Sequence, residues 1–391
     1  NAQSNISVTA HAEVNGSSVT STLTNPGAGS AASLAGNSIA AETSLNTTEQ
    51  TVQGAIDTTF DSSHAGRATV AATSPLVDGD GGIFAGSAQF NLSVTPIANE
   101  SNFAEVSGNS IALTVGGTLG DSLSLEADAN SISAAFTGNN AKNLLAVETG
   151  GATALTSSAG IANLQVNDGV AATDSALTAE SAIAASVLDN PLLTSSLSFE
   201  GNQIKASATG SVADNRLTVE AGLNVDADGD QQNRLDFTPG SESSVTRGGL
   251  FLNNMQLADG SPVSATATDP AAGAALSVDS RGLIDSTLHA DGNSFEAIAL
   301  GNDAYSSILV GGATSFTGAV AASNLQGITD SPVTATASAG TLAVNLGGSA
   351  VSGGTTAVDN VTGSTISVND NTVSALAVGN RDPLLVSVTG T

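Results

Sequence analysis

Apolar and polar residues alternate along much of the chain, and this period of two is the pattern of a β-strand with one buried face. Near the start of the chain, the apolar positions are Ile6, Val8, Ala10, Ala12 and Val14, with Ser7, Thr9, His11 and Glu13 between them. The same alternation returns at 204–208 and 217–221. One Ala-rich stretch, 179–188, predicts a short helix that ends before Pro191. The dominant pattern predicts an all-β fold.

A short motif recurs at intervals: a small residue, Asn, any residue, an aliphatic residue or Phe, any residue, and usually Ala. Its Asn occupies positions Asn37, Asn109, Asn130, Asn202, Asn293 and Asn371. A second marker, Asn-Leu/Met-Gln, begins at Asn163, Asn254 and Asn324. Gly and Asn tolerate the left-handed backbone of sharp corners, and stacked Asn side chains form hydrogen-bonded ladders. The motif therefore predicts repeated corners in a stacked β structure.

The spacing of these markers bears on the architecture. From one Asn of the first motif to the next, the position number rises by 72, 21, 72, 91 and 78, and in the second motif it rises by 91 and then 70. Most intervals resemble one, three or four units of about 21 to 24 residues, and gain or loss of one such unit is natural in a solenoid. We predict a β-solenoid with coils of roughly 21–24 residues. The alternative is a row of tandem β-sandwich domains of about 90 residues.

We expect one continuous β-repeat array over residues 1–391. The markers divide it into modules 1–66, 67–160, 161–252, 253–322 and 323–391.

The composition predicts a narrow core and excludes some classes of partner. Apolar residues make up 40% of the chain but aromatic residues only 3%, so few side chains can fill a wide interior. The net charge is −28 with eight Lys and Arg residues, and no basic cluster of the kind that binds nucleic acid is present. No apolar run approaches the roughly 18 residues of a membrane-spanning helix. We therefore expect no nucleic-acid partner and no membrane-spanning segment.

The chain has no cysteine, so it has no disulfide or thiolate chemistry. It begins with Asn1 rather than Met, from which we expect that an export signal was removed and that the protein is secreted to the exterior or the cell surface. A trimmed segment is the alternative reading of the same observation.

Motifs for catalysis are missing from the sequence. The histidines His11, His64 and His289 stand alone, and neither a Gly-x-Ser-x-Gly elbow nor a phosphate-binding Gly-Lys-Ser/Thr loop occurs. A pair of carboxylates that cleaves glycosides is the alternative, but sugar enzymes on solenoids usually need aromatic platforms, which are scarce here. We predict no enzymatic activity, no catalytic residues and no required cofactor.

The best candidate site is an acidic stretch, 226–236. Calcium takes six to eight oxygen ligands, which alternating Asp residues in a Gly-containing loop can supply. The predicted ligands are Asp226, Asp228, Asp230, Asn233 and Asp236. The loop departs from an EF-hand, because Gly229 is at the fourth position and no bidentate Glu follows. A solvated acidic turn is the alternative.

The Asn motif, the Ser, Thr, Ala, Gly and Val composition and the missing cysteines resemble secreted bacterial β-repeat surface proteins: adhesins, holdfast-anchor-like proteins and curli-like fibre subunits. The resemblance implies export, surface placement and assembly, with no catalytic residues to transfer. Curli-like repeats are shorter and carry regular Gln residues, whereas Gln165, Gln256 and Gln326 are far apart, which argues against a simple amyloid stack.

These observations favour a structural subunit of an extracellular or cell-surface filament or matrix. We expect head-to-tail assembly with other copies through the strands predicted at 6–14 and 384–388, because unpaired strand edges recruit further strands. Cell-surface anchor proteins or polysaccharide are further candidate partners. Two alternatives are a monomeric surface adhesin or glycan- or ice-binding solenoid, and a calcium-stabilised S-layer-like protein.

Overall fold

A computed structural model gives the fold of the chain. It describes residues 2–6, 10–55, 65–69, 76–80, 83–92, 102–149, 159–168, 174–221, 224–227, 232–237, 242–247, 249–270, 274–313, 315–338, 340–346 and 361–390. These residues form strands and turns and no helix, so none of them forms a helix able to span a membrane. The predicted all-β class is confirmed.

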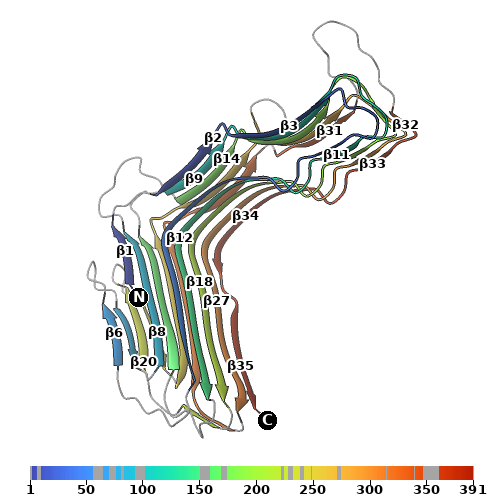
Figure 1. Cartoon of the computed structure of the whole chain (residues 1–391). Helices are drawn as coiled ribbons and strands as arrows, with labels where there is room; N and C mark the ends of the chain where they lie inside the picture. The colour runs from blue at the N-terminus through green and yellow to red at the C-terminus, as the bar shows by residue number, and fades with distance from the viewer. Residues whose placement is uncertain are drawn as a thin grey trace.

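The described residues trace a similar path five times, and each pass, here called a rung, pairs in parallel with the next. The rungs are numbered 1 to 5 from the N-terminal end. Figure 1 shows the stack as a bent body with an upper and a lower arm. In each rung the chain runs up the outer layer of the lower arm, along the upper arm to a tip, and back through one long bent strand.

The long strands form a sheet shared by both arms. Its members are β5 (Ser38–Ala55), β12 (Ser131–Thr149), β18 (Gln203–Ala221), β27 (Ser294–Ala313) and β34 (Thr372–Arg381), with β35 (Leu384–Gly390) also beside β27. In the lower arm this sheet faces β1 (Ala2–Ile6), β8 (Ile83–Leu92), β13 (Ala159–Asp168), β22 (Leu250–Asp259) and β29 (Val320–Thr329).

Two further sheets line the outer layer of the upper arm. The first contains β2 (His11–Asn15), β9 (Asn102–Ser107), β14 (Asp174–Ala179), β23 (Val263–Thr268) and β30 (Val333–Ser338). The second contains β3 (Ser18–Thr24), β10 (Ser110–Gly116), β15 (Ala182–Val187), β24 (Leu276–Ser280) and β31 (Leu342–Leu346). The tip holds short strands: β4 (Ala31–Ser33), β11 (Ser124–Glu126), β17 (Ser196–Ser198), β26 (Thr287–His289) and β33 (Thr365–Ser367), with β16 (Leu192–Leu193), β25 (Leu283–Ile284) and β32 (Val361–Thr362).

Continuous parallel sheets through all five rungs are the arrangement of a solenoid, so this class is confirmed over separate sandwich domains. The coil, however, is much longer than predicted. Residues that stack on each other along the Asn column are 93, 72, 91 and 78 positions apart, so one rung takes the place of the three or four short coils that we predicted.

The short coil was predicted from a spacing of 21 positions that occurs twice, and in neither case is this spacing the length of a coil. Asn109 and Asn130 lie at different corners of the same rung: Asn109 stacks with Ser181, and Asn130 with Asn202. The second spacing is the difference between the intervals of 91 and 70 in the other motif. It reflects the connection from rung 3 to rung 4, which carries extra strands at 232–247.

Extra strands in two connections form a small antiparallel sheet. It contains β6 (Ala65–Thr69) and β7 (Leu76–Asp80) from the first connection and β20 (Gln232–Phe237) and β21 (Glu242–Arg247) from the third. It contacts β13, β22 and β29, which explains why the strands β13 and β22 are buried on both faces. A short parallel pair, β19 (Asn224–Ala227) with β28 (Ser315–Gly318), completes the lower arm.

The predicted helix at 179–188 is wrong. This segment contains the end of β14, a turn and β15, in which half-buried and buried positions alternate. Ile183 stacks between Ile111 and Leu276 in the core, and this packing outweighs the helix propensity of the alanines.

The core is thin and apolar in the upper arm, where Ile132, Phe136 and Ala104 belong to one buried cluster. A column of glycines, Gly138, Gly210, Gly301 and Gly379, crosses the long strands at the junction of the two arms, where Gly210 lies beside Asn167 of β13 and Val263 of β23. A Cβ atom added at Gly210 would lie 2.6 Å from the carbonyl oxygen of Gly301, so a side chain at this position has no room. The close approach of neighbouring rungs therefore favours glycine in rungs 2 to 4, whereas rung 1 has Leu45 at the same register position.

Candidate functional site

The predicted calcium ligands are divided between different parts of the lower arm. Asp226 lies in β19, paired with Thr317 of β28, whereas Asn233 and Asp236 lie in β20. Asp228 and Asp230 lie outside the described residues. Calcium binding by this segment stays a prediction.

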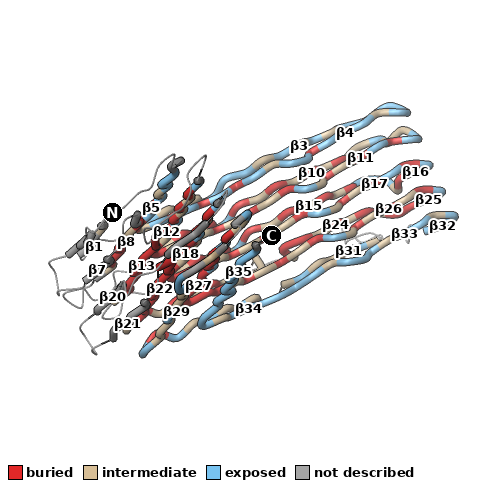
Figure 2. Tube along the Cα trace, turned by 90° about the horizontal axis from the view of Figure 1, so that it is seen from below, coloured by how far each residue is buried: buried red, intermediate tan, exposed pale blue. Residues whose placement is uncertain are grey.

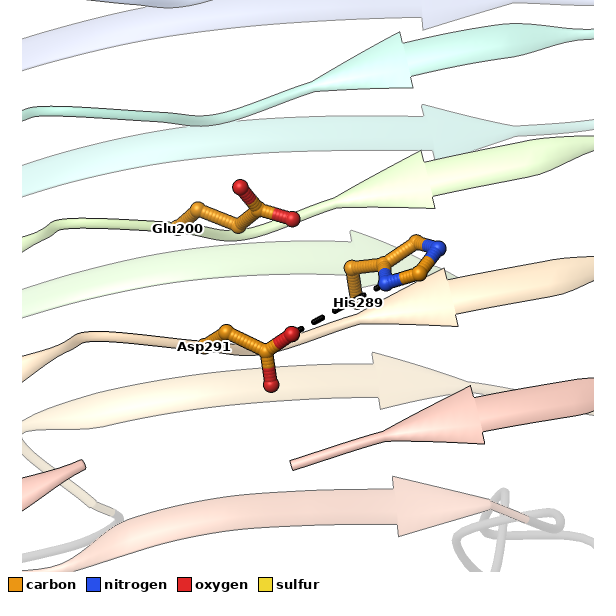
Figure 3. A group of neighbouring side chains, drawn as sticks. All are labelled: Glu200, His289 and Asp291. Carbon is orange, nitrogen blue, oxygen red and sulfur yellow. Dashed lines mark ion pairs between the residues drawn. The ribbon is translucent and has the colours of Figure 1, made fainter. Parts of the chain in front are cut away.

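One group of potential metal ligands occurs at the tip, among the described residues. Glu200, His289 and Asp291 place one ligand atom each within 4.8 Å of one another, and Nδ1 of His289 lies 3.8 Å from Oδ2 of Asp291 (Figure 3). Hydrogen bonds from the Ser367 hydroxyl and the Asn369 main-chain N–H, then the nearby His289, lower the pKa of Asp291.

The same arrangement in rung 2 explains this carboxylate without a metal. Asp128 accepts hydrogen bonds from the Ser198 hydroxyl at 2.8 Å and from the Glu200 main-chain N–H at 2.8 Å, just as Asp291 does from the rung that follows it. The repeated contact ties adjacent rungs at the turn. We interpret the group at Asp291 as a structural turn and assign no ion to it.

The most regular polar feature is a ladder of five Asn residues at the start of the long strands. In rungs 1 to 4, Nδ2 of the Asn donates to Oδ1 of the Asn in the following rung, at 2.9–3.0 Å. The ladder members are Asn37, Asn130, Asn202, Asn293 and Asn371. The residue before each has a left-handed backbone, with φ between 52° and 69°, which agrees with the predicted corners.

Each inner Asn satisfies both of its amide hydrogens. Asn202, which is fully buried, donates from Nδ2 to Oδ1 of Asn293 at 3.0 Å and to the carbonyl of Ala127 at 2.8 Å. Its Oδ1 accepts from the main-chain N and from Nδ2 of Asn130. The ladder thus binds backbone and side chains of successive rungs together.

A second ladder runs through the lower arm with the opposite direction of donation. In rungs 2 to 5, Nε2 of the Gln donates to Oε1 of the Gln in the preceding rung, at 2.6–3.1 Å. Its members are Gln3, Gln89, Gln165, Gln256 and Gln326. Each inner Gln also donates from Nε2 to a carbonyl of the long strand of its own rung, such as Val212 for Gln165.

Wide spacing does not prevent these Gln residues from stacking. The distance between Gln165, Gln256 and Gln326 argues against a simple amyloid stack of short repeats, but it equals the length of one rung, so their amides meet along the solenoid. Their intervals of 91 and 70 match the register between β13, β22 and β29. The interval of 91, which occurs in both motifs, was the signal that could have identified the length of a rung.

The outer rungs have the strand pattern of the inner rungs but are much more exposed (Figure 2). Val373 is 53% exposed, whereas Phe295, its neighbour in rung 4, is 1% exposed; Val386 is 46% exposed beside the buried Ile308. Within the described part of the chain, β34 pairs only with β27, and β5 pairs only with β12. Rungs 1 and 5 therefore present open sheet edges, and we treat these two faces as the candidate functional site.

No family model, curated protein or solved structure matches this chain in comparisons with known proteins.

Proposed function

We propose that the protein is a structural subunit of an extracellular or cell-surface filament, in which rung 5 of one copy stacks on rung 1 of the next. The observation that carries the proposal is the exposure of core-type residues at rung 5. Val373, Val386 and Ile366 continue columns that are buried in rung 4, and each is at least 40% exposed. Open edges with exposed apolar residues bind further strands.

The geometry of the stack favours continued growth. Every sheet that runs through the rungs is parallel, so a copy added to rung 5 would keep the strand direction of the copy before it. Two different faces meet at such a contact, and repetition of a heterologous contact produces an open filament when the rotation does not close a ring.

Charge supports growth along the stack over lateral aggregation. The net charge of −28 makes the sides of neighbouring filaments repel each other, and salt or divalent cations weaken that repulsion. In the direction of the stack, apolar contact and main-chain hydrogen bonds act at short range. We expect single filaments at low salt and bundles at high salt.

Electron microscopy and light scattering over a concentration series test the proposal. We expect filaments of constant width above a critical concentration. The double variant Val373→Asp/Val386→Asp adds carboxylates to the exposed edge and should raise that concentration at least tenfold. Leu188→Asp is the matched control, because Leu188 is also 53% exposed but lies in rung 3. Wild-type protein that stays monomeric at every concentration would rule out the proposed function.

Saccharide binding is a second candidate, supported by a hollow on the long sheet of the lower arm. Tyr305, the single tyrosine of the chain, lies there with the Arg216 guanidinium 5.2 Å from its ring centre. Arg216 and Arg381 pair with Asp214 and Asp303, and such rings and charged groups together suit a sugar. Glycan-array binding that Tyr305→Ala abolishes, without filaments, would favour the adhesin.

A further inference from the structure

We infer that the junction between copies continues the internal register, so that Asn371 of one copy stacks on Asn37 of the next and Gln326 stacks on Gln3. This inference rests on the proposed function and specifies its interface. The contact between neighbouring rungs occurs four times among the described residues, and the contact between copies would repeat it.

The Asn ladder ends in complementary groups. An inner member donates one amide hydrogen to the next rung and one to a carbonyl of the rung before, as Asn293 does to Asn371 and Phe199. Asn371 donates to the carbonyl of Ala290, and its second amide hydrogen points to the place of a sixth rung. At the other end, Oδ1 of Asn37 is the acceptor that a preceding rung would use.

In the Gln ladder the ends are reversed: the donor is in rung 1 and the acceptor is in rung 5. Inner Gln residues donate to the preceding Gln and to a carbonyl of their own rung, whereas Gln3 donates to the carbonyl of Thr47, at 3.0 Å. Its second amide hydrogen therefore suits Oε1 of Gln326 from the copy before it. A junction in register satisfies both ladders at once.

The two ladders lie in different arms, so together they fix the translation and the rotation of one copy on another. A slip by two residues along the strands would leave both ladders unpaired, although it would keep the apolar face of each strand inward. Unpaired buried amides oppose such a slip.

The remaining columns fit the same register. Val373 of one copy would stack on Ile39 of the next, and Leu342 on Val19, so apolar residues meet apolar residues. Glu42 of rung 1 would face Leu376, so this carboxylate does not meet another.

Cysteine cross-linking tests the register, because the chain has no cysteine of its own. The column that contains Ala40 and Ser374 is exposed at both ends. In register, their Cα atoms would be about 4.8 Å apart, which permits a disulfide. Within one copy they are roughly 19 Å apart, four rungs away, so only a bond between copies can form.

The variant Ala40→Cys/Ser374→Cys should give a ladder of covalent multimers after mild oxidation, on a non-reducing gel. The control Glu42→Cys/Ser374→Cys moves one cysteine two residues along the same exposed face, to about 8 Å from its partner. We expect at least tenfold less cross-linked product from it. Ala40→Cys alone should give no ladder.

Microscopy of the same samples separates the two proposals. Filaments with equal or greater cross-linking of the shifted pair would overturn the register and leave the filament in place. Filaments in which neither pair cross-links would also overturn it. If no filaments form from wild-type protein or from either variant, the proposed function fails and the junction fails with it.

Discussion

Replacement of Asn202 by Ala should destabilise the protein strongly, because this side chain occupies the middle of the Asn ladder. It removes the acceptor of the main-chain N–H and one side-chain hydrogen of Asn130, and the donor to the Ala127 carbonyl. Asn130, Ala127 and Asn202 are all fully buried, so water does not reach these groups in the native fold.

The magnitude follows from these three lost partners. A buried donor or acceptor without a partner costs about 1–3 kcal/mol. Partial relaxation and entry of water into the vacated space reduce the total, and we expect a loss of about 4 kcal/mol. That is a large share of the roughly 5–15 kcal/mol by which domains are stable.

Urea unfolding followed by circular dichroism measures this loss, at concentrations low enough to keep the protein monomeric. With an m value of about 3 kcal/mol/M, the midpoint should fall by roughly 1 M. Asn190→Ala is the control, since Asn190 is exposed and donates one hydrogen bond, to Gly117. Its midpoint should move by less than about 0.3 M.

Hydrogen exchange locates the effect. The Asn130 main-chain N–H donates to Oδ1 of Asn202, so Asn202→Ala should lower its protection, while amides of the lower arm keep theirs. A midpoint equal to that of Asn190→Ala, with Asn130 still protected, would refute the view that the ladder holds the rungs together.

Three other predictions concern the bend, a partly buried carboxylate and calcium. Gly210→Ala should destabilise the protein by about 1–3 kcal/mol in urea unfolding, whereas Gly311→Ala, where an added Cβ meets nothing within 4 Å, should change it by less than about 1 kcal/mol. Burial first, and then Asp259, raise the pKa of Asp168, so its charged form weakens the fold above that pKa and the penalty fades as the pH falls toward 3.8. Asp168→Asn should therefore raise the melting temperature at pH 7 and lose this advantage near pH 4. If residues 226–236 bind calcium, adding calcium to wild-type protein that was first treated with a chelator should raise its melting temperature by a few degrees. Asp226→Asn should remove that rise.

Local chemistry made the strands and the corners predictable. Alternation gives a strand one buried face, and β9 and β10 show it throughout. The residue before each ladder Asn must adopt a left-handed backbone, so Gly36, Gly201 and Gly292 recur there. These are constraints within a few residues, which a sequence records directly.

The rung length was not predictable in the same way, because stacking joins residues that are 70 to 93 positions apart. Asn109 and Asn130 carry the same motif but occupy different columns, so the interval between them is a distance within one rung. The extra strands β20 and β21 lengthen one connection without changing the register of the rungs beside it. Spacing alone does not distinguish an inserted hairpin from an added coil.

The opposite directions of the two ladders bear on how copies can meet. Rung 5 presents a donor at Asn371 and an acceptor at Gln326, and rung 1 presents an acceptor at Asn37 and a donor at Gln3. If two copies met through rung 5, Asn371 would lack an acceptor in its counterpart and Gln326 would lack a donor. With the apolar faces of both copies on the same side, the strands would also run antiparallel across that contact, unlike the parallel pairing between the rungs. Contact between unlike faces satisfies both ladders, so the interior amides favour a polar filament over a closed dimer.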